Sequence, residues 1–250
     1  AMSDSNGCIY DFKGIDLDLI KQIKEVERKP MIEHFSSATC INCVTADTTI
    51  SKLTHDNEGL YTYVKFPFNY PYPGDKYYTE DCKVRSEYYG VDGVPRIFFD
   101  GTTMTKEPKQ SHFNERYSIP SYIDIAGAFD VNETTINITA DVISYIDMPD
   151  VRLFVSVNEK TTVGNVGPNK IPEFHHVLMA MASGNEGIDA NFIAGEYQRF
   201  EFSYNMDSTN VEEMNDLEVA VWVQNYESKY YIWRIVLVRY CTFSFTRRPI

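Results

Sequence analysis

Hydrophobic and polar positions in the first half of the chain switch repeatedly between a helical period and a strand period. The segment DLDLIKQIKEVER predicts an amphipathic helix over residues 16–28. Three short apolar runs, PMIEHF, LYTYVKFPF and VPRIFFDG, predict strands. Between them, one predicted helix starts after Cys43 and stops near Gly59, and a second ends at Gly90. This order favours an α/β layer built on a parallel pair of strands with helical crossovers.

The second half of the chain has a different pattern, because helix-length periods disappear from about Ser121 onward. Apolar and polar residues nearly alternate in TTINITADV, VRLFVSVNE, HHVLMAMAS, YQRFEFSYN, LEVAVWVQN and YIWRIVLVR. Such short strands, bounded by turn residues, predict an antiparallel β-sandwich. Pro120 lies at the change of pattern. The sequence therefore predicts an α/β domain over residues 9–118 and an all-β domain over residues 119–250.

Charge and hydropathy exclude several classes of partner. The chain has 250 residues and a formal net charge of −13, with no basic block beyond Arg247 and Arg248. Nucleic acids and anionic membrane surfaces are therefore not expected partners. No apolar run approaches the ~20 residues of a transmembrane helix, so we expect no membrane-spanning segment. The first residues, AMSDSNG, lack the features of an export signal, which leaves a cytosolic protein or a trimmed signal as alternatives.

The motif TCINC places Cys40 and Cys43 between a predicted strand and a predicted helix. Its cysteines could form half of a zinc site, a structural disulfide or a working redox pair. A second CxxC or an HxxxH motif is missing, so neither a metal nor another cofactor is expected. The chain has five cysteines in all, and the pairing of the other three is open. Cys82 could be a third redox partner, but a buried free thiol is favoured; the other two are Cys8 and Cys241.

The segments HFSSATCINC and YGVDGVPRIFFDG together resemble the thioredoxin superfamily over roughly residues 10–118. The resemblance implies a cis Val94–Pro95 bond that lies against the cysteine pair and leaves a backbone edge open to a substrate chain. Cys40 would be the nucleophile, because a helix N-terminus favours a thiolate. Cys43 would be the buried resolving thiol. The alternative is a static disulfide.

The match departs from the family at the residues that handle protons. Thioredoxins carry Trp before the first cysteine, whereas this chain has Thr39. They also carry a buried Asp on the preceding strand, whereas this chain has His34 at that position, with Glu33 beside it. The family's lysine on the next strand matches Lys65. We therefore expect His34 or Glu33 to accept the proton of Cys43, with Lys65 holding the carboxylate or lowering the pKa of the histidine. The alternatives are a core histidine and a charge at a strand edge.

The loop NYPYPGDKYYTED lies between the CxxC motif and the proline strand and is rich in tyrosine. Aromatic side chains with a polar end often contact peptide ligands. We predict a peptide groove that includes Val94 and is lined by Tyr70, Tyr72, Tyr77 and Tyr78.

The whole chain also resembles a narrower family, the outer-membrane-protein-28-related envelope proteins of Bacteroidetes. Besides the segments above, HHVLMAMASGNEG and EVAVWVQNYESKYYIWRIV carry this resemblance. It implies an immunoglobulin-like C-terminal sandwich, a location in the cell envelope and a lipoprotein anchor on the precursor. The first functional hypothesis is an envelope oxidoreductase acting on protein or peptide thiols and disulfides. The second is a non-catalytic surface protein that binds a protein or a glycan.

Overall fold

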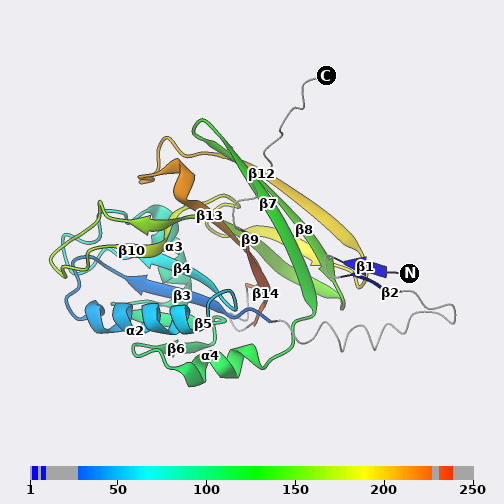
Figure 1. Ribbon diagram of the computed structural model, residues 1–250, viewed down its shortest axis with the longest axis horizontal. Coiled ribbons are helices and arrows are strands. Elements are labelled where there is room, and N and C mark those ends of the chain that lie inside the picture. Colours follow the sequence, from blue (N-terminus) through cyan, green and yellow to red (C-terminus); the bar gives the residue numbers. More distant parts are fainter. Residues whose placement is uncertain (1, 5–6, 10–27, 227–230, 239–250) are drawn as a thin grey trace.

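The computed structural model describes residues 2–4, 7–9, 28–226 and 231–238 (Figure 1). The predicted helix over residues 16–28 lies outside these ranges apart from Arg28, and the side chains of Cys8 and Cys241 lie outside them too. The helices are α2 (Cys43–Asp56), α3 (Glu80–Tyr89) and α4 (Gln110–Tyr117), with a short 3-10 turn η1 (Met214–Asp216).

The strands of the first half follow the predicted segments closely. A separate antiparallel pair precedes them and consists of β1 (Met2–Asp4) and β2 (Gly7–Ile9). The strands that follow are β3 (Met31–Ser36), β4 (Thr62–Pro67), β5 (Arg96–Phe99) and β6 (Thr103–Thr105). Strands β3 and β4 are parallel, as the predicted crossover helix requires, and β5 runs antiparallel to β3. The pattern did not predict β6 and α4, which are only three and eight residues long.

In the second half, the described residues from Ser121 onward form strands and turns, with η1 as their one helical segment. The predicted absence of long helices is thus confirmed for these residues. The strands are β7 (Ile123–Asn132), β8 (Thr135–Ser144), β9 (Met148–Thr162), β10 (Phe174–Met181), β11 (Ile188–Phe192), β12 (Tyr197–Asn205), β13 (Leu217–Asn225) and β14 (Tyr231–Val238).

One sheet runs through both halves of the chain. Its strand order is β14-β13-β9-β10-β4-β3-β5-β6, with β11 also paired to β9. The junction lies between β4 and β10, where Val177 is the partner of Lys65 in a parallel pairing. Strands β12, β8 and β7 form a second, three-stranded sheet, and a large apolar core lies between the two sheets.

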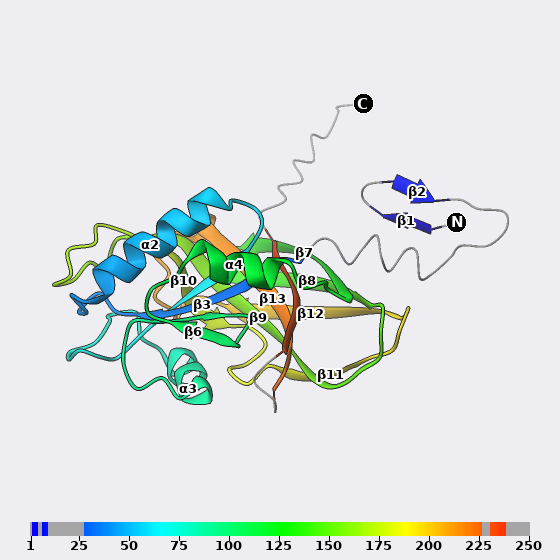
Figure 2. The same cartoon turned by 90° about the horizontal axis from the view of Figure 1, so that it is seen from below.

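The helices cover both faces of the first half of the large sheet. Figure 2 shows α2 and α4 on one face and α3 on the other. Because successive side chains of a strand point to opposite faces of the sheet, neighbouring residues of β3 pack against different helices. Ile32 packs in the core under α2 and α4, whereas Phe35 packs in the core that includes Cys82 of α3. This alternation decides which polar side chains lie near the cysteines.

Candidate functional site

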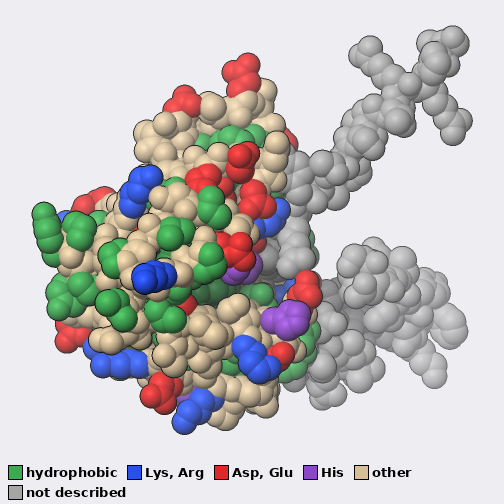
Figure 3. Space-filling view, turned by 60° about the vertical axis from the view of Figure 1, so that its left-hand side comes forward, with side chains coloured by type: hydrophobic (Ala, Val, Ile, Leu, Met, Phe, Trp, Pro, Cys, Tyr) green, Lys and Arg blue, Asp and Glu red, His purple; other side chains and the backbone are tan. Residues whose placement is uncertain are grey.

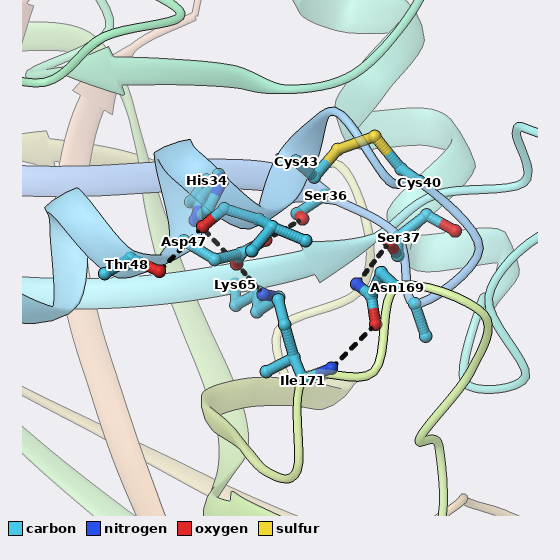
Figure 4. A network of polar contacts seen from close by, with 12 residues as sticks. His34, Ser36, Ser37, Cys40, Cys43, Asp47, Thr48, Lys65, Asn169 and Ile171 are labelled. Carbon is cyan, nitrogen blue, oxygen red and sulfur yellow. Dashed lines mark hydrogen bonds and ion pairs between the residues drawn. A yellow bond between two sulfur atoms is a disulfide. The ribbon is translucent and has the colours of Figure 1, made fainter.

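Cys40 and Cys43 form a disulfide in the turn between β3 and α2 (Figure 4). The S–S distance is 2.05 Å and the Cα atoms are 5.3 Å apart. Cys43 begins the helix and is fully buried. A nucleophilic Cys40 needs access to a substrate, but only 3% of it is exposed. The exposed part of the turn is its tip, where Ile41 is 69% exposed.

Pro95 lies beside the disulfide at the start of β5. The Val94–Pro95 peptide bond is cis, which confirms that prediction. The carbonyl oxygen of Val94 is 3.9 Å from the Sγ of Cys40. The structure therefore brings Cys40, Cys43, Val94 and Pro95 together, although they are about fifty residues apart in sequence.

A buried ion pair lies behind the disulfide. Asp47 is four residues after Cys43, so both side chains project from the same face of α2. The Nζ of Lys65 forms an ion pair with Oδ1 of Asp47, and the Oγ of Ser36 donates a 2.8 Å hydrogen bond to Oδ2 (Figure 4). The side chains of Asp47 and Lys65 are only 8% and 3% exposed. Burial favours a raised pKa for Asp47, but the Lys65 charge and the hydrogen bonds outweigh it and lower the pKa.

His34 occupies the same side of the sheet and, like Asp47, has a lowered pKa. It is fully buried, with Nδ1 at 2.8 Å from the Tyr63 hydroxyl and 3.8 Å from Asp47 Oδ1. Burial lowers the pKa of His34 to about 3, and the Lys65 charge acts in the same direction. The ring is therefore neutral and only weakly basic at physiological pH. Asp47 is a weak base as well, but it carries a negative charge and lies on the same helix as Cys43, four residues along.

Glu33 lies on the opposite face of the sheet, which removes it from the predicted role of proton acceptor. Its carboxylate accepts hydrogen bonds from Arg85 Nε at 2.6 Å and from the Tyr89 hydroxyl at 2.5 Å. Both partners belong to α3. A one-residue offset on a strand reverses the side that a side chain faces, and Glu33 is offset by one from His34.

Two further loops hold the segment that leads into Cys40. The backbone N–H of Ala38 donates to Asp75 Oδ2 at 2.8 Å, and the Thr39 hydroxyl donates to the Pro71 carbonyl at 2.6 Å. From the second half of the chain, the N–H of Asn169 donates to the Ala38 carbonyl at 3.1 Å. Gly167 packs so closely that a Cβ there would lie 2.6 Å from the same carbonyl oxygen.

The four tyrosines of the loop do not share one environment. Tyr70 and Tyr72 are 59% and 92% exposed, so they remain available for contact. Tyr77 is 4% exposed, belongs to the core between the two sheets and donates a 2.6 Å hydrogen bond to Glu212. It therefore does not line a surface groove. Tyr78 is half-buried against the core that contains Cys82.

Cys82 is a free thiol buried inside the molecule. Burial raises the pKa of Cys82 to about 12, so it stays protonated and unreactive in the folded protein. This agrees with the favoured prediction of a buried free thiol over a third redox partner.

Comparison with known proteins gives similarity in fold. No family model and no curated protein matches the sequence. Among solved structures, HBP35 of Porphyromonas gingivalis superposes with a TM-score of 0.70 at 13% identity, covering 90% of this chain and 79% of that one. Protein AGR_C_4864 from Agrobacterium tumefaciens gives 0.58 at 13% identity, covering 88% and 98%. A domain of the outer membrane lipoprotein Omp28 from Porphyromonas gingivalis gives 0.36 at 15% identity, covering 48% and 88%. At these identities, the first two similarities establish a shared fold.

Each helix in the described ranges is too short or too polar to cross a membrane. The same residues contain no group of three or more His, Cys, Asp or Glu side chains placed to hold a metal ion.

Proposed function

We propose that this chain is a cell-envelope thiol–disulfide oxidoreductase that uses Cys40 and Cys43, with a thioredoxin-like first half and an immunoglobulin-like second half. The observation that carries the proposal is the buried carboxylate of Asp47, held by Lys65 one helical turn beyond Cys43. A purely structural disulfide needs no charged pair behind it, and burying such a pair costs several kcal/mol per ion. Buried charged pairs near a reactive group are typical of sites that move protons.

The chemistry in the reducing direction uses both cysteines in turn. The thiolate of Cys40 attacks a substrate disulfide, forms a mixed disulfide and releases one substrate thiolate, which takes a proton from solvent. Cys43 then gives its proton to Asp47, and its thiolate attacks the Sγ of Cys40. The Cys40–Cys43 disulfide forms, and the second substrate sulfur leaves as a thiolate, which takes a proton from solvent. Two electrons pass from the protein to the substrate; oxidation of a substrate dithiol is the reverse sequence.

The proposed location follows from the same bond. Disulfides persist in oxidising compartments and are rare in the cytosol. The Cys40–Cys43 bond therefore supports a place in the cell envelope, which is also what the resemblance to the outer-membrane-protein-28-related proteins implies. The lipid anchor belongs to the same proposal.

The test of the proposal is redox exchange by the purified protein. We expect the Cys40–Cys43 pair to equilibrate with a glutathione series and the reduced protein to reduce a polypeptide disulfide. Cys40→Ser should abolish turnover, whereas Cys43→Ser should trap a mixed disulfide because the resolving thiol is gone. A reduction potential below about −300 mV, together with no exchange, would identify a structural disulfide.

The second candidate function is a non-catalytic surface protein, and one observation favours it. Cys40 is only 3% exposed, and Thr39 beside it is tied to the Tyr-rich loop through Pro71. A disulfide closed off in this way stiffens a loop and performs no exchange. If exchange fails, Tyr70 and Tyr72 become the first surface to test for binding of a protein or a glycan, because both remain exposed.

A further inference from the structure

The ion pair behind the disulfide also forms part of the wall of a pocket. This pocket lies between α2 and residues 169–176 of the second half and has a volume of about 630 Å³. Both Asp47 and Lys65 line it. Figure 3 shows a recess on this side of the molecule, flanked by histidine side chains in purple. Among the lining residues, His55 is exposed and His175 is half-buried.

The disulfide itself is closed to solvent on its own side. Cys43 is 0% exposed and Cys40 is 3% exposed, whereas the side chain of Asp47 keeps 8% of its surface accessible. A proton released by Cys43 must nevertheless reach bulk water during each reaction cycle. Because Asp47 faces both the helix turn of Cys43 and the pocket, its carboxylate connects the two.

The composition of the pocket suits water rather than a dry contact. Its inner end carries the charges of Asp47 and Lys65, and Thr48 and Ser51 of α2 line one side. A site that is polar and much larger than one water molecule, whose share of liquid volume is about 30 Å³, holds water readily. The ammonium group of Lys65 has three N–H donors, and Asp47 Oδ1 accepts a hydrogen bond from one of them. The Nζ of Lys65 also lies 4.2 Å from the centre of the Phe174 ring.

We infer that this pocket is the path by which protons pass between Asp47 and solvent when Cys43 is oxidised or reduced. The inference rests on the proposed function and adds a role for the second half of the chain, since residues 169–176 form the opposite wall. Asp47 is the proton-accepting group, and the residues of the wall position the water that carries the proton onward. No electron transfer passes through the pocket.

The experiment compares large side chains placed inside and outside the pocket. Thr48 and Thr49 are neighbours on α2, both are exposed, and each hydroxyl donates a 2.8 Å hydrogen bond to the carbonyl four residues earlier. Thr48 lines the pocket, whereas Thr49 does not. Thr48→Trp should therefore fill the path, and Thr49→Trp is its matched control. Ser51→Trp, also exposed and lining the pocket, is a second variant in case the first does not fold.

The measured quantity is the rate at which Cys43 resolves the mixed disulfide in a single turnover, at fixed pH and ionic strength and with increasing imidazole buffer. In the unmodified protein and in Thr49→Trp, we expect the rate to rise with buffer concentration. In Thr48→Trp or Ser51→Trp, we expect a rate at least about tenfold lower and no response to buffer, since acid–base assistance typically contributes 10²–10⁴-fold. The reduction potential should stay the same in all variants.

The outcomes separate this inference from the proposed function. If the unmodified protein shows no exchange with any disulfide, the proposed function fails and this inference fails with it. If it exchanges normally and both folded pocket variants keep the rate and buffer response of Thr49→Trp, the proposed function stands and the proton path is overturned. A changed reduction potential in the pocket variants alone would also overturn it, because the effect would then be on the stability of the disulfide.

Discussion

At the scale of single residues, Asp47 and Glu33 are two buried carboxylates with different surroundings. Each is paired with a buried cation, Lys65 or Arg85, and the two lie on opposite faces of the same sheet. Losing one partner of a buried pair leaves an uncompensated charge, which typically costs about 3–5 kcal/mol. The two pairs therefore make similar contributions to folding, but only Asp47 shares a helix face with Cys43.

This difference gives the first prediction. Asp47→Asn should lower the free energy of unfolding by about 3 kcal/mol and also slow the resolving step by on the order of 10²-fold, because the proton acceptor is lost. Glu33→Gln is the matched control, and it should destabilise the fold by a similar amount while leaving the resolving step unchanged. Urea unfolding and single-turnover kinetics measure the two effects. Equal kinetic loss in both variants would show that Asp47 acts only through stability.

His34 supplies the second prediction, which concerns pH. Its pKa is about 3 in the folded state against 6.5 when exposed, so the unfolded chain binds the extra proton between these values. The stability from a neutral His34 is complete above pH 6.5 and is lost as pH falls toward 3. The difference corresponds to on the order of 5 kcal/mol.

The measurement is the free energy of unfolding at several pH values between 6.5 and 4.5. The unmodified protein should lose stability more steeply than His34→Gln, whose side chain does not titrate. Glu159 has the opposite sign, since burial raises its pKa to about 7 and its contribution falls as pH rises. Because Glu159 is present in both proteins, the difference between them isolates His34. Parallel pH profiles would mean that His34 is not buried in the neutral form.

At the scale of elements, the loop that contains Gly167 fixes the approach to Cys40. A Cβ at Gly167 would lie 2.6 Å from the oxygen and 2.9 Å from the carbonyl carbon of Ala38, so backbone atoms would have to move. Gly167→Ala should therefore destabilise the protein by about 1–3 kcal/mol and increase the rate at which a small thiol reduces the Cys40–Cys43 disulfide. Gly93→Ala is the control, because a Cβ there meets no atom within 4 Å. Equal reduction rates in the two variants would contradict a restraining role for this loop.

The sequence predicted those elements whose signal is local. Strand periods and the Gly90 helix end located β3, β4, β12, β13 and α3 to within about two residues, and the cis Val94–Pro95 bond followed from the resemblance. The short β6 and α4 carry too few residues for a period to show. Asp47 could have been found, because it stands four residues after Cys43 on a predicted helix. The contacts of Asp75, Gly167 and Asn169 with Ala38 join distant segments, and no local pattern encodes them.

At the scale of the whole molecule, the two predicted halves share a sheet and its cores. Strand β10 of the second half pairs with β4 of the first. One core combines Phe35 and Phe66 of the first half with Phe154 and Trp222 of the second. The rings of Phe154 and Trp222 stack with their centres 5.1 Å apart. Residues that pack in one core unfold together, so a boundary near residue 118 separates two sequence patterns while the packing continues across it.

This continuity gives the last prediction, that both halves unfold in a single transition. Cys82 is a free thiol in that shared core and reports on the first half. The extent of its alkylation is measured by mass spectrometry of the peptide that contains it, at increasing urea concentrations. Fluorescence reports chiefly on the second half through Trp222. We expect the two midpoints to coincide. Leu178→Ala truncates a fully buried side chain of β10 in the same core, so it should destabilise the protein by about 2–5 kcal/mol and lower both midpoints by the same amount.

If alkylation of Cys82 instead kept its midpoint in Leu178→Ala while the fluorescence transition moved to lower urea, the halves would be independent domains. The wall of the pocket formed by residues 169–176 would then be able to separate from α2 without unfolding the disulfide site, and the proton path would open and close with the docking of the second half.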